Sequence, residues 1–473
     1  MIDGTSVNNN KKALKSGVWY TASNFLIKSI GFITTPIFTR LLTKTEFGLY
    51  NNYTSWLSIV MIFVTLNLES TLISARFDFK EKFDEYILSM LSLSSISALV
   101  WLLVANLWSS KIEILLGLPK VYINAMLIYL LALPAINFFQ ARERYYYEYK
   151  KTVITSMFLS VGTALLSVVL VVFLPDKLSG RIIGAVLPTI IMGIAFYGFF
   201  VKKGKRIKIH YWKYALPICI PYIPHLLSMT LLNAMDRIMI DRWCGSEQTA
   251  LYSLAYNCGA IVTLLLNSIN SAFSPWLGEK LSENKSDEVR AFSKVYISGF
   301  IVFSFGIMLI APEVLLLLGG KNYYEAIYVM TPVSMGCICQ FLYTLFVNVE
   351  QFKKKTIGMA IASVIAAIIN LLLNWALIPK IGYLAAAYTT LVGYLCLLVM
   401  HMYLVYRMRL HKIYSYKFIL TAVIVSLIVM VVVTFLYSNA YLRYVICTIY
   451  GVTIFAVCYK FRKKIFHVIK KKK

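Results

Sequence analysis

The stretch FILTAVIVSLIVMVVVTFLY, residues 418–437, runs for 20 residues without a charged side chain. A helix of about 20 apolar residues crosses the roughly 30 Å hydrocarbon core of a bilayer. Similar blocks recur along the 473 residues of the chain, of which 59% are hydrophobic and 14% charged. Soluble domains carry about 25% charged residues. The sequence therefore predicts an all-α integral membrane protein with no room for a soluble domain.

We predict about 14 membrane-spanning helices from the length and continuity of these blocks. Helices are expected rather than a barrel because the blocks are long and unbroken, and a helix satisfies its own backbone hydrogen bonds in lipid. The predicted spans are residues 16–39, 48–74, 86–108, 120–139, 153–174, 182–201, 218–240, 249–272, 292–312, 325–346, 358–378, 383–404, 418–437 and 443–460.

Lysines and arginines are distributed unequally between alternate loops. About 34 lie on one predicted side of the membrane and about 10 on the other. Basic loops remain in the cytoplasm, so both termini are predicted to lie on the cytoplasmic side of the membrane. The net charge of +26 then reports topology rather than nucleic-acid binding. Two basic, aromatic-rich segments, 140–151 and 202–214, could also contact acidic lipid headgroups.

An internal repeat appears at a constant shift of 202 residues. The segment RLLTKTEFGLY at 40–50 aligns with RWCGSEQTALY at 242–252. Three further matches occur at the same shift. They pair Leu115–Gly117 with Leu317–Gly319, Glu148 with Glu350, and Gly180, Gly184 and Ala185 with Gly382, Ala386 and Ala387.

This shift covers six predicted helices, which is an even number. The two halves therefore have the same orientation and are related by an axis along the membrane normal. We predict an architecture of two six-helix lobes, residues 1–201 and 202–404. Residues 405–473 add two C-terminal helices and a basic cytoplasmic tail.

Few charges lie inside the predicted spans. A charge at the bilayer centre costs at least about 2.5–3.5 kcal/mol, so such residues usually face a cavity. Asn24 and Lys28 are four residues apart and share one helix face, and Asn233 and Arg237 repeat that spacing in the second half. If both faces line a central cleft, the cleft suits an anionic, hydroxyl-rich ligand, because arginine can grip phosphate with two hydrogen bonds. A structural salt bridge between Arg237 and Glu69 or Asp236 is the alternative.

Two further pairs complete the candidate site. Arg40 and Arg242 occupy equivalent outer ends of the first and seventh predicted helices. Glu69 and Asp236 are the carboxylates predicted within the spans, so they are candidates for coupling transport to an ion.

The chemistry of an enzyme is not apparent in this sequence. It contains no HExxH motif and no Ser/His/Asp arrangement, and Gly319-Gly320-Lys321 lacks the rest of a phosphate-binding loop. The predicted outer loops are short, whereas membrane glycosyltransferases and polymerases generally need a larger one. We therefore expect a transporter rather than an enzyme, with no metal or cofactor.

Several stretches are similar to one known family. The opening segment SGVWYTASN at 16–24, the motif at 40–50, ALP at 215–217, PYIPH at 221–225 and LNAMDR at 232–237 resemble the bacterial polysaccharide-transport family. Its members are Wzx-type flippases of the multidrug/oligosaccharidyl-lipid/polysaccharide superfamily. The resemblance covers essentially the whole chain.

This resemblance implies a fold of two lobes around a cationic cavity. It also implies a polyprenyl-pyrophosphate-linked oligosaccharide, such as an O-antigen, capsule or exopolysaccharide repeat unit, carried from the inner to the outer leaflet and coupled to an ion gradient. Lys28 and Arg237 would hold the pyrophosphate or acidic sugars, and Asn24 and Asn233 would contact sugar hydroxyls. Membrane lipids, a polysaccharide polymerase and assembly proteins are the expected partners, and nucleic acid is not.

Three other activities remain open on the sequence. Two belong to the same superfamily, a lipid II flippase and a multidrug antiporter. Drug antiporters typically have 12 helices and a more acidic cavity. The third is a membrane glycosyltransferase or polymerase, against which the short outer loops and the repeat both weigh.

Overall fold

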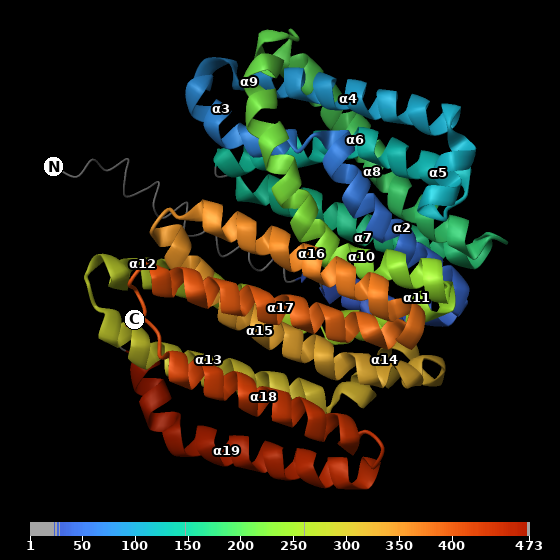
Figure 1. Ribbon diagram of the computed structural model, residues 1–473. Helices are drawn as coiled ribbons and strands as arrows, with labels where there is room; N and C mark the ends of the chain where they lie inside the picture. Colours follow the sequence, from blue (N-terminus) through green and yellow to red (C-terminus); the bar gives the residue numbers. More distant parts are fainter. Residues whose placement is uncertain (1–22, 24–25, 28, 147, 260, 471–473) are drawn as a thin grey trace. The chain divides into compact units, whose positions relative to one another are not determined.

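The computed structural model describes residues 23, 26–27, 29–146, 148–259 and 261–470 (Figure 1). Throughout these residues the secondary structure is helical, with α-helices, short 3-10 helices and no strand. The chain divides into two compact units. The first holds residues up to Ser253 together with 318–320 and 363–386, and the second holds 254–317, 321–362 and the chain from Ala387 onward.

The first unit has a helix over residues 29–41, and its main helical elements follow in chain order. These are α2 (Lys44–Thr65), η1 (Leu68–Thr71), α3 (Leu72–Asp78), α4 (Phe83–Leu107), α5 (Ser109–Leu116), α6 (Lys120–Tyr145), α7 (Tyr149–Phe173), α8 (Lys177–Gly204), α9 (His210–Cys219) and α10 (Ile223–Cys244).

The second unit is built largely from the later helices. They are α12 (Ile261–Ser282), α13 (Ser286–Leu309), α14 (Ala311–Gly319), α15 (Ile327–Phe352), α17 (Tyr383–Arg407), α18 (Tyr416–Leu436) and α19 (Ala440–Lys470). The helices α11 (Ser246–Gly259) and α16 (Thr356–Ile381) have residues in both units, as do the end of α14 and the start of α17.

Eleven helices in the described part of the chain are long and apolar enough to cross a membrane. A twelfth results if Lys44–Thr65 and Leu68–Asp78, bent by 52°, form one broken span, and Ala440–Ala456 is a shorter apolar helix. Most of the predicted span 16–39 precedes residue 29, where continuous description begins. The prediction of an all-α membrane fold is confirmed, whereas the exact number of 14 helices stays a prediction.

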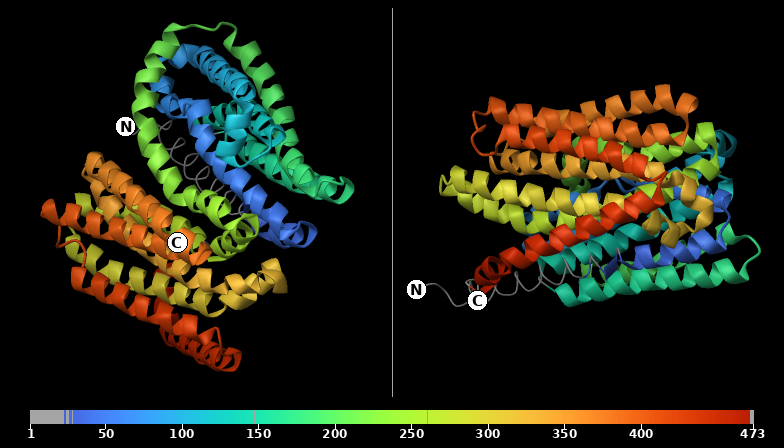
Figure 2. Two further views of the ribbon diagram at one scale, coloured as in Figure 1. Left: turned by 45° about the vertical axis from the view of Figure 1, so that its right-hand side comes forward. Right: turned by 90° about the horizontal axis from the view of Figure 1, so that it is seen from below.

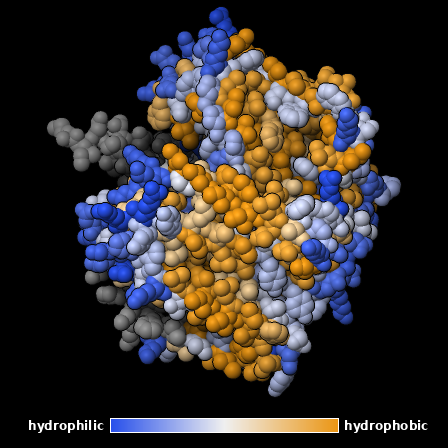
Figure 3. Space-filling model, viewed as in Figure 1, coloured by the Kyte–Doolittle hydropathy of each residue, from blue (hydrophilic) through white to orange (hydrophobic). Residues whose placement is uncertain are grey.

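Apolar side chains cover the middle of the helices on the face shown in Figure 3, and hydrophilic side chains gather at the helix ends. A helix that exposes apolar residues along most of its length would be unstable in water but is normal in lipid. The helix α7 illustrates this pattern, because Phe158, Leu165 and Phe173 are all exposed. This distribution of side chains is the one expected of membrane-spanning helices.

Glycine sets the spacing within the first unit. The antiparallel helices α7 and α8 lie side by side (Figures 1 and 2). A Cβ on Gly180 would lie 2.7 Å from the Leu170 carbonyl oxygen, and one on Gly184 would lie 2.3 Å from Ser167 Cα. Small residues spaced four apart allow membrane helices to approach closely. The glycines that marked the sequence repeat therefore hold α8 against α7.

The repeat is visible in the helix boundaries. A shift of 202 residues carries the first residue of α2, Lys44, onto the first residue of α11, Ser246. The same shift carries α4 and α5 to within a few residues of the bounds of α13 and α14. The lobe boundaries at residues 201 and 404 remain predictions.

Two irregular segments interrupt the first unit. Leu66 and Asn67 adopt left-handed backbone conformations, with φ of 52° and 48°, and they break the helix between α2 and η1. Pro221 lies in a 3-10 turn between α9 and α10, where its missing N–H leaves a backbone carbonyl without its usual donor. The first of these breaks forms one wall of a cavity described below.

Candidate functional site

The larger cavity of the first unit lies among α2, α6, α7 and α8, with Ile27 also contributing, and has a volume of about 420 Å³. We call it the α2–α8 cavity. Its lining follows α6 from Tyr129 to Gln140, which is roughly 16 Å of helix at 1.5 Å per residue. Its polar lining residues are Tyr50, Tyr53, Thr54, Tyr129, Asn137, Gln140, Ser156, Ser160, Thr163, Arg181 and Thr189. None of the described residues that line it is a carboxylate.

Arg181 is the cation among the described residues that line this cavity. It is the fifth residue of α8, and Ala185 and Thr189 follow at four-residue intervals on the same helix face. Its guanidinium carbon lies 3.7 Å from the ring centre of Phe38 and 4.5 Å from that of Tyr50. Within the described structure these cation–π contacts hold Arg181, and no ion pair does. Aromatic faces leave the edge of the guanidinium, with its N–H donors, available to an anion.

Tyrosines provide the second feature of the cavity. The rings of Tyr50 and Tyr53 are stacked with their centres 6.4 Å apart. The Tyr53 hydroxyl is buried and has no hydrogen-bond partner among the described residues. A buried hydroxyl without a partner costs about 1–3 kcal/mol, so a ligand group that bonds to it would recover that energy. At the other end of the cavity, Gln140 Nε2 donates to Ser156 Oγ at 3.1 Å.

A smaller cavity of about 170 Å³ lies next to the break after α2. Asn137 lines both cavities, which places the smaller one on the adjoining side of α6. Glu69, from η1, is its charged lining residue, and Arg144 Nη2 lies 3.0 Å from Glu69 Oε1. Arg237 was one predicted partner of Glu69, but the structure shows an ion pair between Glu69 and Arg144 at the end of α6.

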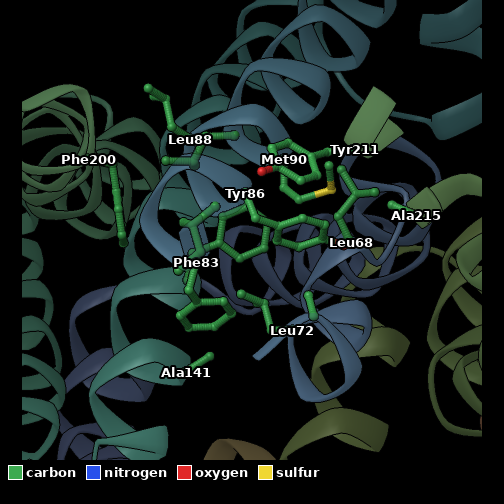
Figure 4. Packing of buried hydrophobic residues seen from close by; sticks show 14 of the residues in the cluster. Leu68, Leu72, Phe83, Tyr86, Leu88, Met90, Ala141, Phe200, Tyr211 and Ala215 are labelled. Atoms are coloured by element: carbon green, nitrogen blue, oxygen red, sulfur yellow. The ribbon is translucent and has the colours of Figure 1, made fainter. Parts of the chain in front are cut away.

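A buried aromatic cluster fixes η1 and hence Glu69. Tyr86 on α4 is fully buried and donates a 2.7 Å hydrogen bond to Thr71 Oγ1, the last residue of η1. Figure 4 shows Tyr86 and Tyr211 with Leu68, Leu72 and Phe83 in this cluster. Because the tyrosine hydroxyl and the leucine packing both act on η1, the position of Glu69 depends on α4 and α9.

Asp236 belongs to a separate buried polar cluster. It is 1% exposed, and it accepts hydrogen bonds of 2.6 Å from both the Tyr252 hydroxyl and Asn374 Nδ2. Asn374 Nδ2 also lies 3.2 Å from Asn370 Oδ1. Asn370 and Asn374 are one turn apart on α16, which explains how one helix supplies both amides. This cluster brings together a carboxylate, two amides and a phenol, all of which offer oxygen atoms to a cation or a proton.

A second aspartate in α10, Asp241, joins that helix to α2. Asn52 Nδ2 donates to its carboxylate at 2.8 Å, and Ser246 Oγ donates at 2.7 Å. Nearby, a Cβ on Gly48 would lie only 1.8 Å from the Ser246 carbonyl oxygen. The repeated motif at 40–50 and 242–252 therefore corresponds to a packing contact.

Of the two predicted pairs, each an asparagine with a cation, the structure describes only the one on α10. Lys28 and Asn24 fall outside the described residues. On α10, Asn233 Nδ2 donates to the Met229 carbonyl and Arg237 Nη1 to the Asn233 carbonyl, at 2.8 and 3.0 Å. Asn233 is exposed, Arg237 is half-buried, and neither lines the two cavities described above.

The other predicted cations, Arg40 and Arg242, are exposed at the ends of their helices. The roles of all six predicted contact residues therefore stay predictions. Sequence reasoning missed Arg181 because it was placed in a loop, although its four-residue spacing to Ala185 and Thr189 was available.

Some cations of the basic segments at 140–151 and 202–214 form ion pairs within the first unit. Arg142 contacts Asp84 at 2.5 and 3.0 Å and Glu143 at 2.5 Å. Lys208 Nζ lies 2.9 Å from Glu85 Oε1. Internal pairing of this kind leaves these charges less available to lipid than the sequence suggested.

Comparison with known proteins supports the fold and the family. The family model described as polysaccharide biosynthesis protein matches residues 13–281, and the MatE model matches residues 221–376. A protein of the Lsg locus of Haemophilus influenzae is 23% identical over 376 residues, which cover 76% of this chain and 89% of that protein. A protein named as a probable low-salt glycan biosynthesis flippase, Agl15 of Haloferax volcanii, is 24% identical over 35% of this chain and 36% of its own length.

Solved structures of related fold agree with this assignment. The lipid II flippase MurJ in an inward closed conformation superposes with a TM-score of 0.67 at 13% identity, covering 95% of this chain and all of that one. An inward-facing multidrug transporter of the MATE family gives a TM-score of 0.59 at 14% identity, covering 82% and 95%. These likenesses concern the fold. Since the polysaccharide biosynthesis model matches more than half of the sequence, the chain belongs to that family of flippases in the multidrug/oligosaccharidyl-lipid/polysaccharide superfamily, and it is a transporter rather than an enzyme.

Proposed function

We propose that this transporter moves polyprenyl-pyrophosphate-linked oligosaccharide repeat units from the inner to the outer leaflet of a bacterial cytoplasmic membrane by alternating access. Both termini would lie in the cytoplasm. The observation that carries the proposal is the α2–α8 cavity, in which Arg181, three tyrosines and a row of hydroxyls and amides meet without a carboxylate. A lipid-linked oligosaccharide combines the two matching chemistries, an anionic pyrophosphate and a polyhydroxylated sugar.

Each part of the cavity suits one part of such a ligand. Aromatic faces pack against the apolar faces of sugar rings, while amides and hydroxyls bond to sugar hydroxyls, as a few fixed polar groups do in most ligand sites. Arg181 would bind a phosphate or an acidic sugar with its planar guanidinium. Lys28, Arg237, Asn24 and Asn233 are proposed to contact the same substrate, with Arg40 and Arg242 at its exit.

The alternatives differ in the charge of their substrate. A multidrug antiporter that exports cations is disfavoured by a cavity lined with an arginine and no carboxylate. A lipid II flippase remains the second candidate, because its substrate also carries a pyrophosphate and sugars and the likeness to MurJ covers nearly the whole chain. The size of the sugar portion, rather than its charge, separates these two activities.

Coupling to an ion is proposed at the carboxylates. Asp236, buried with Tyr252 and Asn374, is positioned to exchange a proton or bind a cation, and Glu69 is positioned to release and recapture Arg144. The membrane potential would add to the driving force. Each negative charge that leaves a negative cytoplasm gains about 2.3 kcal/mol per 100 mV. A polysaccharide polymerase and assembly proteins would act on the exported unit.

The experiment is depletion of the protein followed by assay of lipid-linked intermediates on each leaflet. We expect a complete repeat unit to accumulate at the inner leaflet while surface polysaccharide is lost, and an R181A variant should reproduce the defect. Accumulation of lipid II would favour the second candidate. Altered drug tolerance with normal polysaccharide would overturn the proposal, as would unpolymerised units at the outer leaflet.

A further inference from the structure

The second unit carries a basic pocket that transport of the substrate does not require. It has a volume of about 510 Å³ and lies where α15 ends, α16 begins and α17 ends. We call it the α15–α17 pocket. The lysine and arginine distribution predicts that this end of the helices faces the cytoplasm. Its lining residues are Glu350, Lys354, Lys355, Ile357, Gly358, Leu404, Arg407 and Met408.

The acidic residue of the pocket already has a buried partner. Glu350 and His401 are 1% and 2% exposed, and His401 Nδ1 lies 2.9 and 3.1 Å from the two carboxylate oxygens of Glu350. Because Glu350 is on α15 and His401 on α17, this buried contact also joins the two helices beneath the pocket. The carboxylate is therefore occupied, and it does not pair with the cations at the rim.

Two of the cations that line the pocket, Lys354 and Lys355, lie on the turn between α15 and α16. Lys354 adopts a left-handed conformation with φ of 56°, and the N–H groups of Lys354 and Lys355 bond back to the carbonyls of Gln351 and Glu350. The helix α16 starts at the next residue, so both lysines precede its N-terminus. The partial positive charge of a helix N-terminus adds to the attraction for an anion.

The cations of this pocket differ from the ion-paired cations of the first unit. There, Arg142 and Lys208 are paired with carboxylates. Here, Lys354, Lys355 and Arg407 are exposed, and within the described chain none of them forms an ion pair. Three neighbouring like charges repel one another, so an anion between them would be stabilising.

Apolar residues extend from the pocket along α16. Ile357 is 77% exposed, and Ile361, one turn further into the span, is 53% exposed. Leu404 of α17 packs close to Gly358, where a Cβ would lie 3.2 Å from the leucine side chain. A phosphate among the cations would thus sit at the head of an apolar, outward-facing strip that acyl chains could follow.

We propose that the α15–α17 pocket binds the headgroup phosphate of an anionic phospholipid from the adjacent leaflet, with its acyl chains along Ile357 and Ile361. Figure 3 shows hydrophilic side chains gathered at helix ends beside an apolar band, as this arrangement requires. Basic residues near a membrane surface attract anionic lipid by about 1 kcal/mol each, or about fivefold in affinity. The site is independent of the proposed substrate.

The test is binding of phosphatidylglycerol and phosphatidylcholine to the purified, delipidated full-length protein, measured by native mass spectrometry and by thermal stability. We expect phosphatidylglycerol to bind more tightly and to stabilise. Each single variant K354Q, K355Q or R407Q should lose about fivefold in affinity, and the triple variant about 100-fold. The control triple R409Q/K412Q/K417Q removes the same charge from the same end of the unit but leaves the pocket lining intact, so its affinity should change by less than threefold.

Three outcomes would overturn the proposal. Equal losses in both triple variants would mean diffuse attraction of the basic surface to anionic lipid. Equal stabilisation by inorganic phosphate or glycerol 3-phosphate would mean an anion site without a lipid. Equal binding of phosphatidylcholine would mean that the charges play no part. Thermal midpoints measured in neutral lipid identify any variant that has simply misfolded.

Discussion

Two arginines in the first unit are held in opposite ways. Arg142 at the end of α6 contacts the carboxylates of Asp84 and Glu143, and Glu143 is 1% exposed. Arg181 at the start of α8 lies on the faces of Phe38 and Tyr50 inside the α2–α8 cavity. Carboxylates consume the N–H donors of an arginine, whereas aromatic faces do not. The pairing of each cation, rather than its depth in the membrane, is therefore what distinguishes a structural charge such as Arg142 from the charge that we propose binds the ligand.

The largest effect is expected for R142A. Removing one partner of a buried ion pair leaves uncompensated charge and costs about 3–5 kcal/mol. We expect the purified protein to lose thermal stability and much of its yield, with flipping lost as a consequence. Thermal unfolding in detergent measures this, and K150A, which removes an exposed charge from the same basic segment, should behave as wild type. Unchanged stability of R142A would remove the basis of the comparison.

For R181Q we expect transport to be lost while thermal stability is retained. Loss of the cation–π contacts costs only about 0.5–1 kcal/mol, so the thermal midpoint should barely change. Export of lipid-linked oligosaccharide in depleted cells should fall at least tenfold, since a charge-assisted bond to an anion contributes about 1.5–3 kcal/mol. K111Q, at an exposed site, is the matched control. Full export with R181Q would contradict the assignment of the cavity.

Tyr53 and Tyr86 allow the same comparison between a side chain in the cavity and one in the packed core. Y53F removes a buried hydroxyl that has no partner among the described residues, so stability should be unchanged or higher. Export should fall about threefold to tenfold if that hydroxyl bonds to the substrate. Y86F removes the hydroxyl that donates to Thr71, so it should lower the thermal midpoint instead. Export rates corrected for the amount of folded protein distinguish the two variants.

The smallest effect is expected at the N-cap of α8. Asp176 caps this helix, and the hydrogen bonds from Ser179 and Tyr122 lower the pKa of its carboxyl although partial burial opposes them. Because the pKa is lower in the folded state, the stabilisation is present above about pH 4 and is lost as the pH falls through the folded value. D176A should cost about 0.5–2 kcal/mol.

Since Arg181 lies five residues after this cap, export should decline slightly in D176A. Thermal midpoints measured from pH 7 down to pH 3 should converge for wild type and variant. A constant difference across that range would show that the cap does not act through its charge.

The sequence predicted the helices better than the site. Hydropathy located the spans because each one must be apolar along its whole length, and the repeat in residues 40–50 and 242–252 marked equivalent helix starts. The cavity was missed for the same reason. The apolar block begins near residue 182, whereas α8 begins at Lys177, so Arg181 was placed in a loop.

Ion pairing was equally invisible in the sequence. The contact between Glu69 and Arg144 joins residues 75 apart, and the one between Glu350 and His401 joins residues 51 apart. Periodicity indicates which residues share a face of one helix, but it does not indicate which helices meet. The basic segments therefore appeared alike until the neighbouring carboxylates were known.

The contact between Gly48 and Ser246 has a mechanical consequence. The backbones of α2 and α11 approach so closely there that any side chain at position 48 would overlap the Ser246 carbonyl. Beside that point, the hydrogen bond from Asn52 to Asp241 joins α2 to α10. A point where two backbones are in contact resists sliding of the helices but tolerates a change in the angle between them. During a transport cycle, the helices of this region are therefore expected to swivel about residue 48, and the α2–α8 cavity would widen or narrow with the angle.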